Sequence, residues 1–179
     1  MAANSILIAG FGGQGILFAA KQLALAGMYL NKKVTWMPSY GPETRGGSSN
    51  CTVMISDEEI GSPVTPSPEI LIAMNLPSYI KFHGSVKKGG TLICDSSLIT
   101  EKSGREDIQK YYIPATSLAH ETNMAKLANV IMLGKLVAAT GIFTTGELIM
   151  SMEKSIPNSK KDLLELNIKA LNIGYNYAG

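Results

Sequence analysis

The stretch Ser5–Ala20, SILIAGFGGQGILFAA, decides the fold of the chain. It contains the apolar run Ile6–Ala9, which is typical of a central parallel strand that is buried on both faces. From Ile16 onwards apolar residues recur at steps of three and four, which predicts a helix. Between strand and helix lies a G-x-G-x-x-G turn with one additional glycine: Gly10, Gly12, Gly13 and Gly15. Such a turn leaves backbone N–H groups at a helix N-terminus, where an anion can bind.

The same glycines have a structural interpretation. Gly10 and Gly12 permit a tight turn, and the small residues after them let the helix lie close to the sheet. An NAD-binding unit would also carry an acid near the end of its second strand, about 20 residues on, to bind the ribose hydroxyls. The corresponding stretch Lys33–Tyr40, KVTWMPSY, contains no acid. The sequence therefore disfavours dinucleotide binding and leaves a structural turn and an anion-binding turn as the alternatives.

Composition bounds the class of protein. The 179 residues, of which 45% are hydrophobic, suffice for one sizeable core, so we expect a single domain over residues 1–179. The net charge of +2 without a Lys/Arg run argues against nucleic acid as a partner. Cys51 and Cys94 lack metal-site spacing, which excludes a disulfide framework and a self-contained zinc or iron–sulfur site and favours buried free thiols over one disulfide. Neither a signal peptide nor a membrane span is expected, which predicts a cytoplasmic protein.

A loop rich in glycine and proline, Ser39–Ser49 (SYGPETRGGSS), follows the predicted second strand. Loops carry function more often than core elements do. Arg45, which is followed by Gly46 and Gly47, offers a planar guanidinium to a carboxylate or a phosphate. The alternative is a solvated surface turn, in which Glu43 and Arg45 are ordinary surface charges.

The remaining chain alternates strands and helices. Asn50–Ser56 alternates in polarity and follows the previous strand without a helix between them, so we expect it to be antiparallel. From Met124 to the end the pattern is helical, with close contact allowed at Gly134, a capping box at Thr144 and a further helix cap at Ser159. The fold class is therefore α/β: a three-layer open sheet, Rossmann-like, mostly parallel with one antiparallel strand, and a helical C-terminal third. Three further strands complete the sheet: Ile70–Met74, Thr91–Asp95 and Tyr111–Pro114.

Chemistry-bearing residues are sparse. Asp95 ends a predicted strand, where ligands bind in open α/β sheets, although capping of a turn or helix is the alternative. We find no nucleophile elbow, no Walker lysine, no histidine cluster and no convincing carboxylate pair. The residues alone therefore predict no catalytic and no metal-binding residue.

Six stretches in chain order resemble signatures of the gamma subunit of 2-oxoacid:ferredoxin oxidoreductases. They are Ile8–Ile16 (IAGFGGQGI), Pro38–Gly47 (PSYGPETRGG), Ile60–Pro63 (IGSP), Ile70–Asn75 (ILIAMN), Asp95–Leu98 (DSSL) and Leu166–Tyr175 (LNIKALNIGY). Within this family the chain looks most like the 2-oxoglutarate branch, with pyruvate, branched-chain 2-oxoacid and indolepyruvate subunits as near alternatives. Thr44, where the family usually has methionine, and the stretch Glu121–Asn123 depart from the pattern.

The resemblance implies one part of a larger enzyme. The family decarboxylates a 2-oxoacid on thiamine diphosphate with Mg, passes electrons through [4Fe-4S] clusters to ferredoxin, and transfers the acyl group to coenzyme A. Those cofactors belong to other subunits, so the expected partners are alpha, beta and, where present, delta subunits, ferredoxin through the complex, the 2-oxoacid and coenzyme A. The isolated chain is expected to be inactive, with a homodimer as one form.

Two glycine-rich segments, Gly10–Gly15 and Ser39–Gly47, follow strands, so we expect them to lie on the same edge of the sheet and to form the candidate binding site for coenzyme A, substrate or a partner. The competing hypotheses are a scaffold subunit whose loops only build an interface, and a stand-alone nucleotide-binding protein. The candidate binding residues are Gly10, Gly12, Gly13, Gln14, Gly15, Ser39, Tyr40, Glu43, Arg45, Gly46 and Gly47.

Overall fold

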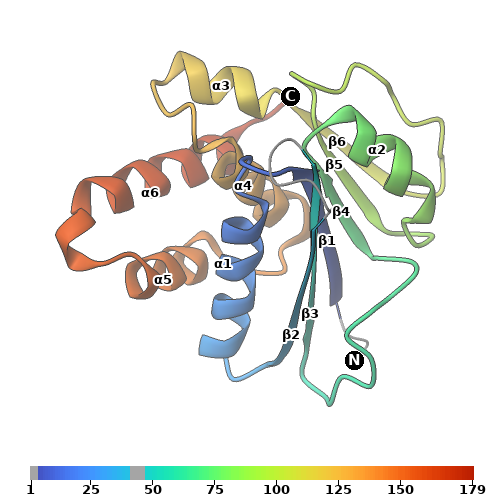
Figure 1. The fold of residues 1–179 in the computed structure, drawn as a ribbon, viewed down its shortest axis with the longest axis horizontal. Helices are drawn as coiled ribbons and strands as arrows, with labels where there is room; N and C mark the ends of the chain where they lie inside the picture. The colour runs from blue at the N-terminus through green and yellow to red at the C-terminus, as the bar shows by residue number, and fades with distance from the viewer. Residues whose placement is uncertain (1–3, 41–46) are drawn as a thin grey trace.

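The computed structural model of the chain describes residues 4–40 and 47–179 (Figure 1). All strands lie within the residues up to Ile113, with helices only after the first and the fourth strand, and helices follow from there to the end. The strands are β1 (Asn4–Phe11), β2 (Lys33–Tyr40), β3 (Ser48–Ser56), β4 (Ile70–Ala73), β5 (Thr91–Asp95) and β6 (Gln109–Ile113). The helices are α1 (Ile16–Tyr29), α2 (Leu76–Phe82), α3 (Ala115–Glu121), α4 (Ala128–Thr140), α5 (Thr145–Ser155) and α6 (Lys161–Asn176), with short 3₁₀ turns at His83–Ser85 and Asn158–Lys160.

The six strands form one mixed sheet in the order β2-β3-β1-β4-β5-β6. Strands β1, β4, β5 and β6 are parallel to one another, whereas β3 is antiparallel to both of its neighbours. This confirms the predicted mostly parallel sheet with one antiparallel strand. It also places β3, which follows β2 without a crossover helix, between β1 and β2.

Helices cover both faces of the sheet. Helices α1, α4, α5 and α6 lie on one side, and α2 lies on the other beside β4 and β5 (Figure 1). Alternate residues of β1 enter separate cores: Ile6 and Ile8 face the large helical core, and Leu7 and Ala9 face the smaller core under α2. All four are at most 7% exposed, which confirms that this strand is buried on both faces.

The helices of the C-terminal third agree with only some of the helix caps and helix starts predicted from the sequence. Thr144 and Glu147 form the predicted capping box at the start of α5. The predicted cap at Ser159 is wrong, because residues 158–160 form a 3₁₀ turn and α6 begins at Lys161 without a side-chain cap. The apolar stripe that starts at Met124 continues into α4, although the helix itself begins only at Ala128.

Helices α4 and α6 cross at two glycines. A Cβ atom on Gly134 would overlap the carbonyl oxygen of Leu171, and one on Gly174 would overlap that of Ile131. These neighbours are backbone atoms, so they cannot move aside as a flexible side chain would. The predicted close approach at Gly134 is therefore confirmed.

We expect Gly134→Ala or Gly174→Ala to lower the free energy of unfolding by about 3 kcal/mol, because the added methyl group must force two helices apart. Gly146→Ala is the matched control, since its Cβ would meet only Thr144 Oγ1 at 3.9 Å within a helix. There the change should be neutral or stabilising by about 0.5 kcal/mol. Urea unfolding measures all three, and equal effects would contradict the tight crossing.

Both cysteines are free and buried, which confirms the expected buried thiols. Burial raises the pKa of the Cys51 thiol to about 11 and that of Cys94 to about 12. A donor from Met37 lowers the first pKa slightly, and the charge of Lys102 has the same effect on the second. Since the thiolate is the reactive form, neither cysteine is a nucleophile near neutral pH.

A thiol-specific reagent at pH 8 should therefore label the unfolded chain rapidly and the folded chain at least a hundredfold more slowly. Unfolded thiols ionise near pH 8.5, well below the pKa values of about 11 and about 12 of the folded ones. The stability that burial of the thiols contributes is thus complete below about pH 8 and falls as the pH rises towards 11. Fast labelling of either cysteine in the native chain would contradict this.

Candidate functional site

The connections that leave β1 and β4 turn away from each other. After β1 the chain crosses through α1 to β2 on one face of the sheet, and after β4 it crosses through α2 to β5 on the other face (Figure 1). Strands β1 and β4 are parallel neighbours, so their C-terminal ends meet at this divergence. Open α/β sheets bind ligands in the crevice outside such a topological switch point.

The glycine turn occupies this point, and three of its glycines are favoured by backbone conformation or by close neighbours. Gly13 (φ 99°) and Gly15 (φ 74°) have left-handed backbones that strain other residues. A Cβ on Gly10 would lie 2.5 Å from Gln14 Oε1 and 2.8 Å from Ile16 Cδ1. A Cβ on Gly12 would have Gly47 O as its nearest atom, at 3.9 Å, so there is room for a side chain at this position.

Gln14 joins the two strands across the switch point. Its Oε1 accepts a hydrogen bond from Phe11 N (2.7 Å), and its Nε2 donates to Met74 O (2.9 Å). Asn75, which caps α2 through Ser78 N, places its own Nδ2 3.5 Å from the same Oε1. The side-chain amide of Gln14 is thus committed to holding the ends of β1 and β4 together.

Asn129 is a buried contact of the turn that the sequence did not reveal. It is 3% exposed and donates from Nδ2 to Gly15 O (3.0 Å), while its Oδ1 is buried without a hydrogen-bond partner within the described part of the chain. A Cβ on Gly15 would overlap this amide. Asn129 lies 114 residues from Gly15, so no local motif could indicate the pairing.

The second candidate segment ends beside the glycine turn. Gly12 N donates to Gly47 O (3.0 Å), and Phe11 is paired with Ser48 at the start of β3. Ser39, exposed, is paired with Asn50 near the end of β2. Tyr40 is described only as the last residue of β2, paired with Ser49. Glu43, Arg45 and Gly46 lie outside the described residues.

A small cavity of about 180 Å³ opens at the switch point. Helices α1 and α4 begin beside this cavity, at Ile16 and Ala128. The N-terminus of a helix carries a partial positive charge. Exposed Lys126 adds a full positive charge. The cavity suits a carboxylate or phosphate group, but it is smaller than the roughly 300–1,000 Å³ that a whole cofactor needs. Its walls are Gly13, Gln14, Met74, Leu98, Thr116, Ala125, Lys126 and Ala128.

Of the two roles considered for Asp95, ligand binding and capping, the structure supports capping. Its fully buried carboxylate accepts hydrogen bonds from Ser97 N (3.1 Å), from Thr116 N (3.2 Å) and from Thr116 Oγ1 (2.6 Å). These bonds fix the start of α3 against the end of β5. The capping interpretation of Asp95 is therefore the one that the geometry supports.

The position of β3 explains the missing ribose-binding acid. Because β3 separates β1 from β2, the end of β2 lies two strand spacings, about 10 Å, from the glycine turn. An acid at the end of β2 would not sit beside a ligand on the turn as it does in an NAD-binding sheet.

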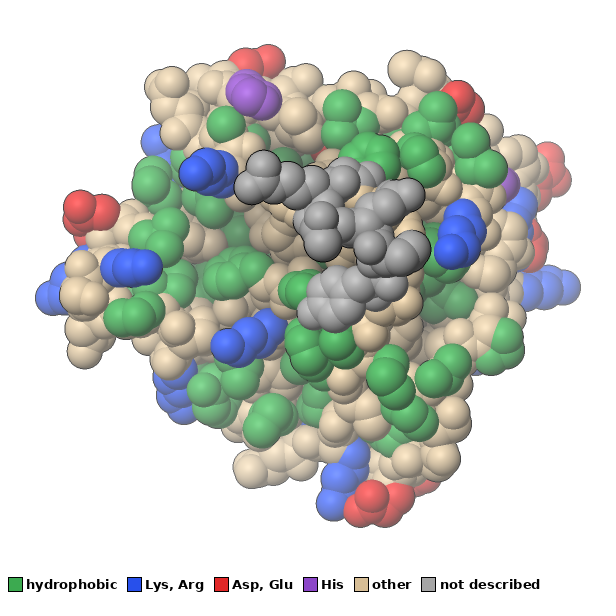
Figure 2. Space-filling model, in the orientation of Figure 1, with side chains coloured by type: hydrophobic (Ala, Val, Ile, Leu, Met, Phe, Trp, Pro, Cys, Tyr) green, Lys and Arg blue, Asp and Glu red, His purple; other side chains and the backbone are tan. Residues whose placement is uncertain are grey.

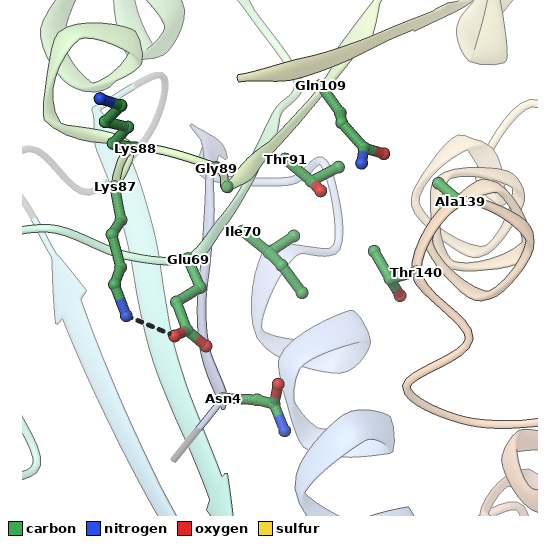
Figure 3. Close-up of a pocket in the computed structure, with 11 residues that line it drawn as sticks. Asn4, Glu69, Ile70, Lys87, Lys88, Gly89, Thr91, Gln109, Ala139 and Thr140 are labelled. Atoms are coloured by element: carbon green, nitrogen blue, oxygen red, sulfur yellow. Dashed lines mark hydrogen bonds and ion pairs between the residues drawn. The ribbon is translucent and has the colours of Figure 1, made fainter. Parts of the chain in front are cut away.

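A larger hollow of about 410 Å³ lies at the opposite end of the strands, where β4, β5 and β6 begin (Figure 3). Two of its three charged groups, Glu69 and Lys87, form an ion pair at 2.8 Å, and Lys88 is the third. The backbone N–H groups of Gly90 and Thr91 are already bonded to Lys87 O and Glu69 O. We therefore place the candidate site at the switch point, where helix N-termini converge.

Two further findings bound the chemistry of the described residues. No three His, Cys, Asp or Glu side chains among residues 4–40 and 47–179 cluster as metal ligands would. No helix of these residues is long and apolar enough to cross a membrane.

Fold and site together define an α/β domain whose glycine turn builds an anion-sized crevice without a catalytic set of its own among the residues that the structure describes. Residues 5–177 match the family model described as pyruvate ferredoxin/flavodoxin oxidoreductase. The chain therefore belongs to this family, as the resemblance predicted, and it is similar to gamma-type subunits of 2-oxoacid:ferredoxin oxidoreductases.

Three similar proteins support this assignment. The 2-oxoglutarate synthase subunit KorC of Methanocaldococcus jannaschii is 40% identical over 98% of this chain and 94% of its own length. The ketoisovalerate oxidoreductase subunit VorA of Methanothermobacter marburgensis is 35% identical over 97% of this chain, which spans only 36% of VorA. The crystal structure of the keto/oxoacid ferredoxin oxidoreductase gamma subunit from Geobacter sulfurreducens has a TM-score of 0.85 and 29% identity, covering 98% of this chain and 95% of that one.

Gln14→Met should lower the free energy of unfolding by about 2 kcal/mol, because it keeps the length of the side chain but loses both hydrogen bonds.

Gln14→Glu keeps the acceptor for Phe11 N, yet as a carboxylate it cannot donate to Met74 O. Protonation restores that donor, so the folded pKa of the introduced carboxyl group should be raised. The stability of this variant should then recover below about pH 4 and fall as the pH rises. Urea titrations at pH 4 and 7 test this, and pH-independent stability relative to the parent chain would contradict the bridge.

Proposed function

We propose that this chain is the gamma subunit of a thiamine diphosphate-dependent 2-oxoglutarate:ferredoxin oxidoreductase. The complex would convert 2-oxoglutarate, coenzyme A and oxidised ferredoxin to succinyl-CoA, CO₂ and reduced ferredoxin. Thiamine diphosphate with Mg and the [4Fe-4S] clusters would be held by alpha, beta and delta partner subunits. The observation that carries the choice of substrate is the full-length likeness to KorC, at 40% identity.

The contribution of this chain is the anion-sized crevice at the switch point. The helix N-termini of α1 and α4 and the charge of Lys126 favour a carboxylate or a phosphate there. Coenzyme A carries phosphates and the oxoacid carries carboxylates, so both offer such a group. Because the cavity is only about 180 Å³, the rest of the ligand would lie outside it, against a partner subunit.

A scaffold role is the second candidate, and one observation favours it. Gln14 and the N–H of Gly12, two prominent polar groups of the turn, are already bonded within the chain. The turn would then build an interface without touching a ligand. Activity of the partner subunits alone discriminates the two: full turnover without this chain favours the scaffold, and turnover that requires it favours a part in the site.

Co-purification tests the assignment to a complex. An affinity-tagged chain, expressed in its source organism, should bring down thiamine- and iron–sulfur-bearing subunits. Among 2-oxoglutarate, pyruvate, 2-oxoisovalerate and indolepyruvate, the first should give the highest kcat/KM. A preference for 2-oxoisovalerate would move the chain to the branch of VorA, and the absence of such partners would contradict the proposed function.

In the assembled complex, Arg45→Ala should raise the KM for coenzyme A or the oxoacid about tenfold or more, because a charge-assisted hydrogen bond is lost. Arg45→Lys should recover part of the effect, since the charge remains but the planar fork does not. Lys88→Ala, beside the hollow at the other end of the strands, is the control. Unchanged kinetics for Arg45→Ala, with assembly intact, would remove Arg45 from the site.

A further inference from the structure

Two helices start beside the small cavity at the switch point, and neither start is capped by a side chain. Helices α1 and α4 lie on the same face of the sheet (Figure 1). The residue before α1 is Gly15 and the residue before α4 is Leu127, and neither makes a side-chain cap. The first backbone N–H groups of both helices can therefore donate to an anion. The geometry that an anion meets depends on the spacing between these two helix starts.

One hydrogen bond joins the glycine turn to α4. Asn129, in the first turn of α4, donates from Nδ2 to Gly15 O at 3.0 Å. Within residues 4–40 and 47–179, no other hydrogen bond links residues 10–15 to α4. Gly15 O also accepts from Ala19 N at 3.0 Å, which is the first bond of α1. Asn129 therefore holds the start of α4 against the carbonyl group with which α1 begins.

Stability does not explain an asparagine at this position. Asn129 is 3% exposed, and its Oδ1 has no hydrogen-bond partner in the described part of the chain. A buried oxygen without a partner lowers stability. Gly15 O is already satisfied by Ala19 N, so the turn does not need the amide as a second donor. A leucine has the same branched shape and would avoid the unpaired oxygen.

The amide differs from leucine in how closely it approaches the turn. Its nitrogen lies 3.0 Å from Gly15 O, whereas a carbon atom contacts a carbonyl oxygen at roughly 3.3–3.6 Å. A Cβ on Gly15 would overlap the same amide, so the glycine leaves the space that the amide fills. Asn129 thus brings the two helix starts closer together than an apolar side chain of the same size could.

The surrounding charges favour an anion between the two helix starts. Lys126, two residues before α4, is exposed and forms part of the cavity wall, as do Gly13 and Ala128. On the face of the molecule that Figure 2 displays, acidic side chains lie towards the rim, whereas several basic side chains lie nearer the middle. The spacing that Asn129 sets therefore lies where a carboxylate or phosphate would be attracted.

We propose that Asn129 is the positioning residue of the switch point. It fixes the start of α1 relative to the start of α4, so that the N–H groups of both helices can bind one carboxylate or phosphate group together. The chain keeps a buried unpaired oxygen in exchange for this spacing. The inference rests on the proposed function, because it takes the anionic ligand, coenzyme A or the oxoacid, from there.

Asn129→Leu in the assembled complex tests the proposal. The KM for coenzyme A or for the oxoacid should rise about fivefold or more, with kcat within about twofold of the parent, because a binding geometry is lost. The midpoint of thermal unfolding of the variant chain should stay within about 3 °C of the parent or rise, because the unpaired oxygen is removed. A purely structural bond would show the opposite pattern, with lower stability and an unchanged KM.

Asn167→Leu is the matched control. Asn167 is also buried, donates from Nδ2 to the carbonyl oxygen of Leu163, and has an unpaired Oδ1. It lies in α6, which contributes no residue to the cavity wall described here. The control makes the same chemical change away from the switch point, so the KM values should stay within about twofold of the parent.

Asn129→Asp is an independent variant of the same shape. Its carboxylate cannot donate to Gly15 O, and it adds a negative charge beside the cavity. The KM for the anionic ligand should therefore rise more than in Asn129→Leu. Co-purification with the partner subunits and thermal unfolding verify that each variant is folded and assembled.

The outcomes separate this inference from the proposed function. A higher KM for both Asn129 variants, with Asn167→Leu like the parent, supports the positioning role. If the parent complex turns over and both Asn129 variants keep the parent KM values, the inference is overturned and the proposed function stands. The same holds if Asn129→Leu only destabilises the chain. If the parent complex turns over no 2-oxoacid, or does so equally well without this chain, the proposed part in the site fails and the inference fails with it.

Discussion

The side-chain amide of Gln14 links the C-terminal ends of β1 and β4, where the two halves of the sheet diverge, beyond the backbone ladder that pairs these strands. It bonds the end of β1 through Phe11 N and the end of β4 through Met74 O, while Asn75 beside it caps α2. This geometry requires glycine at positions 10, 13 and 15, because any larger residue overlaps the bridge or strains the backbone. The crevice at the switch point therefore depends on a turn whose conformation is held by its own glycines and by the hydrogen bonds of Gln14.

The insertion of β3 between β1 and β2 gives the glycine motif a different use from that in a dinucleotide-binding sheet. The hairpin returns the chain to the glycine turn at Gly47, whose carbonyl oxygen accepts a hydrogen bond from Gly12 N. It also moves the end of β2 away from the crevice and leaves one sheet face without a helix among the described residues. One change in strand order thus accounts for the absent ribose acid and for the position of Gly47 beside the turn.

Local patterns in the sequence predicted most of the fold. The apolar run Ile6–Ala9, the alternation in β3 and the capping box at Thr144 are signals carried by residues close in sequence, and all three were confirmed. The cap at Ser159 failed because a 3₁₀ turn competes with capping at the same residues. Asn129 and the partner of Gln14 could not be predicted, since each contacts a residue at least 60 positions away. The glycine turn was located from sequence, but its internal hydrogen bonds were not.

Hydrogen exchange of this chain, alone and within the reconstituted complex, tests most directly whether the switch point faces the partner. Among the described residues no backbone acceptor bonds the N–H groups of Gly13 and Gly15, so they should exchange rapidly in the isolated chain. We predict that assembly slows exchange at residues 10–15 and 47–54. Protection confined to residues 87–91, at the opposite end of the strands, would contradict the account.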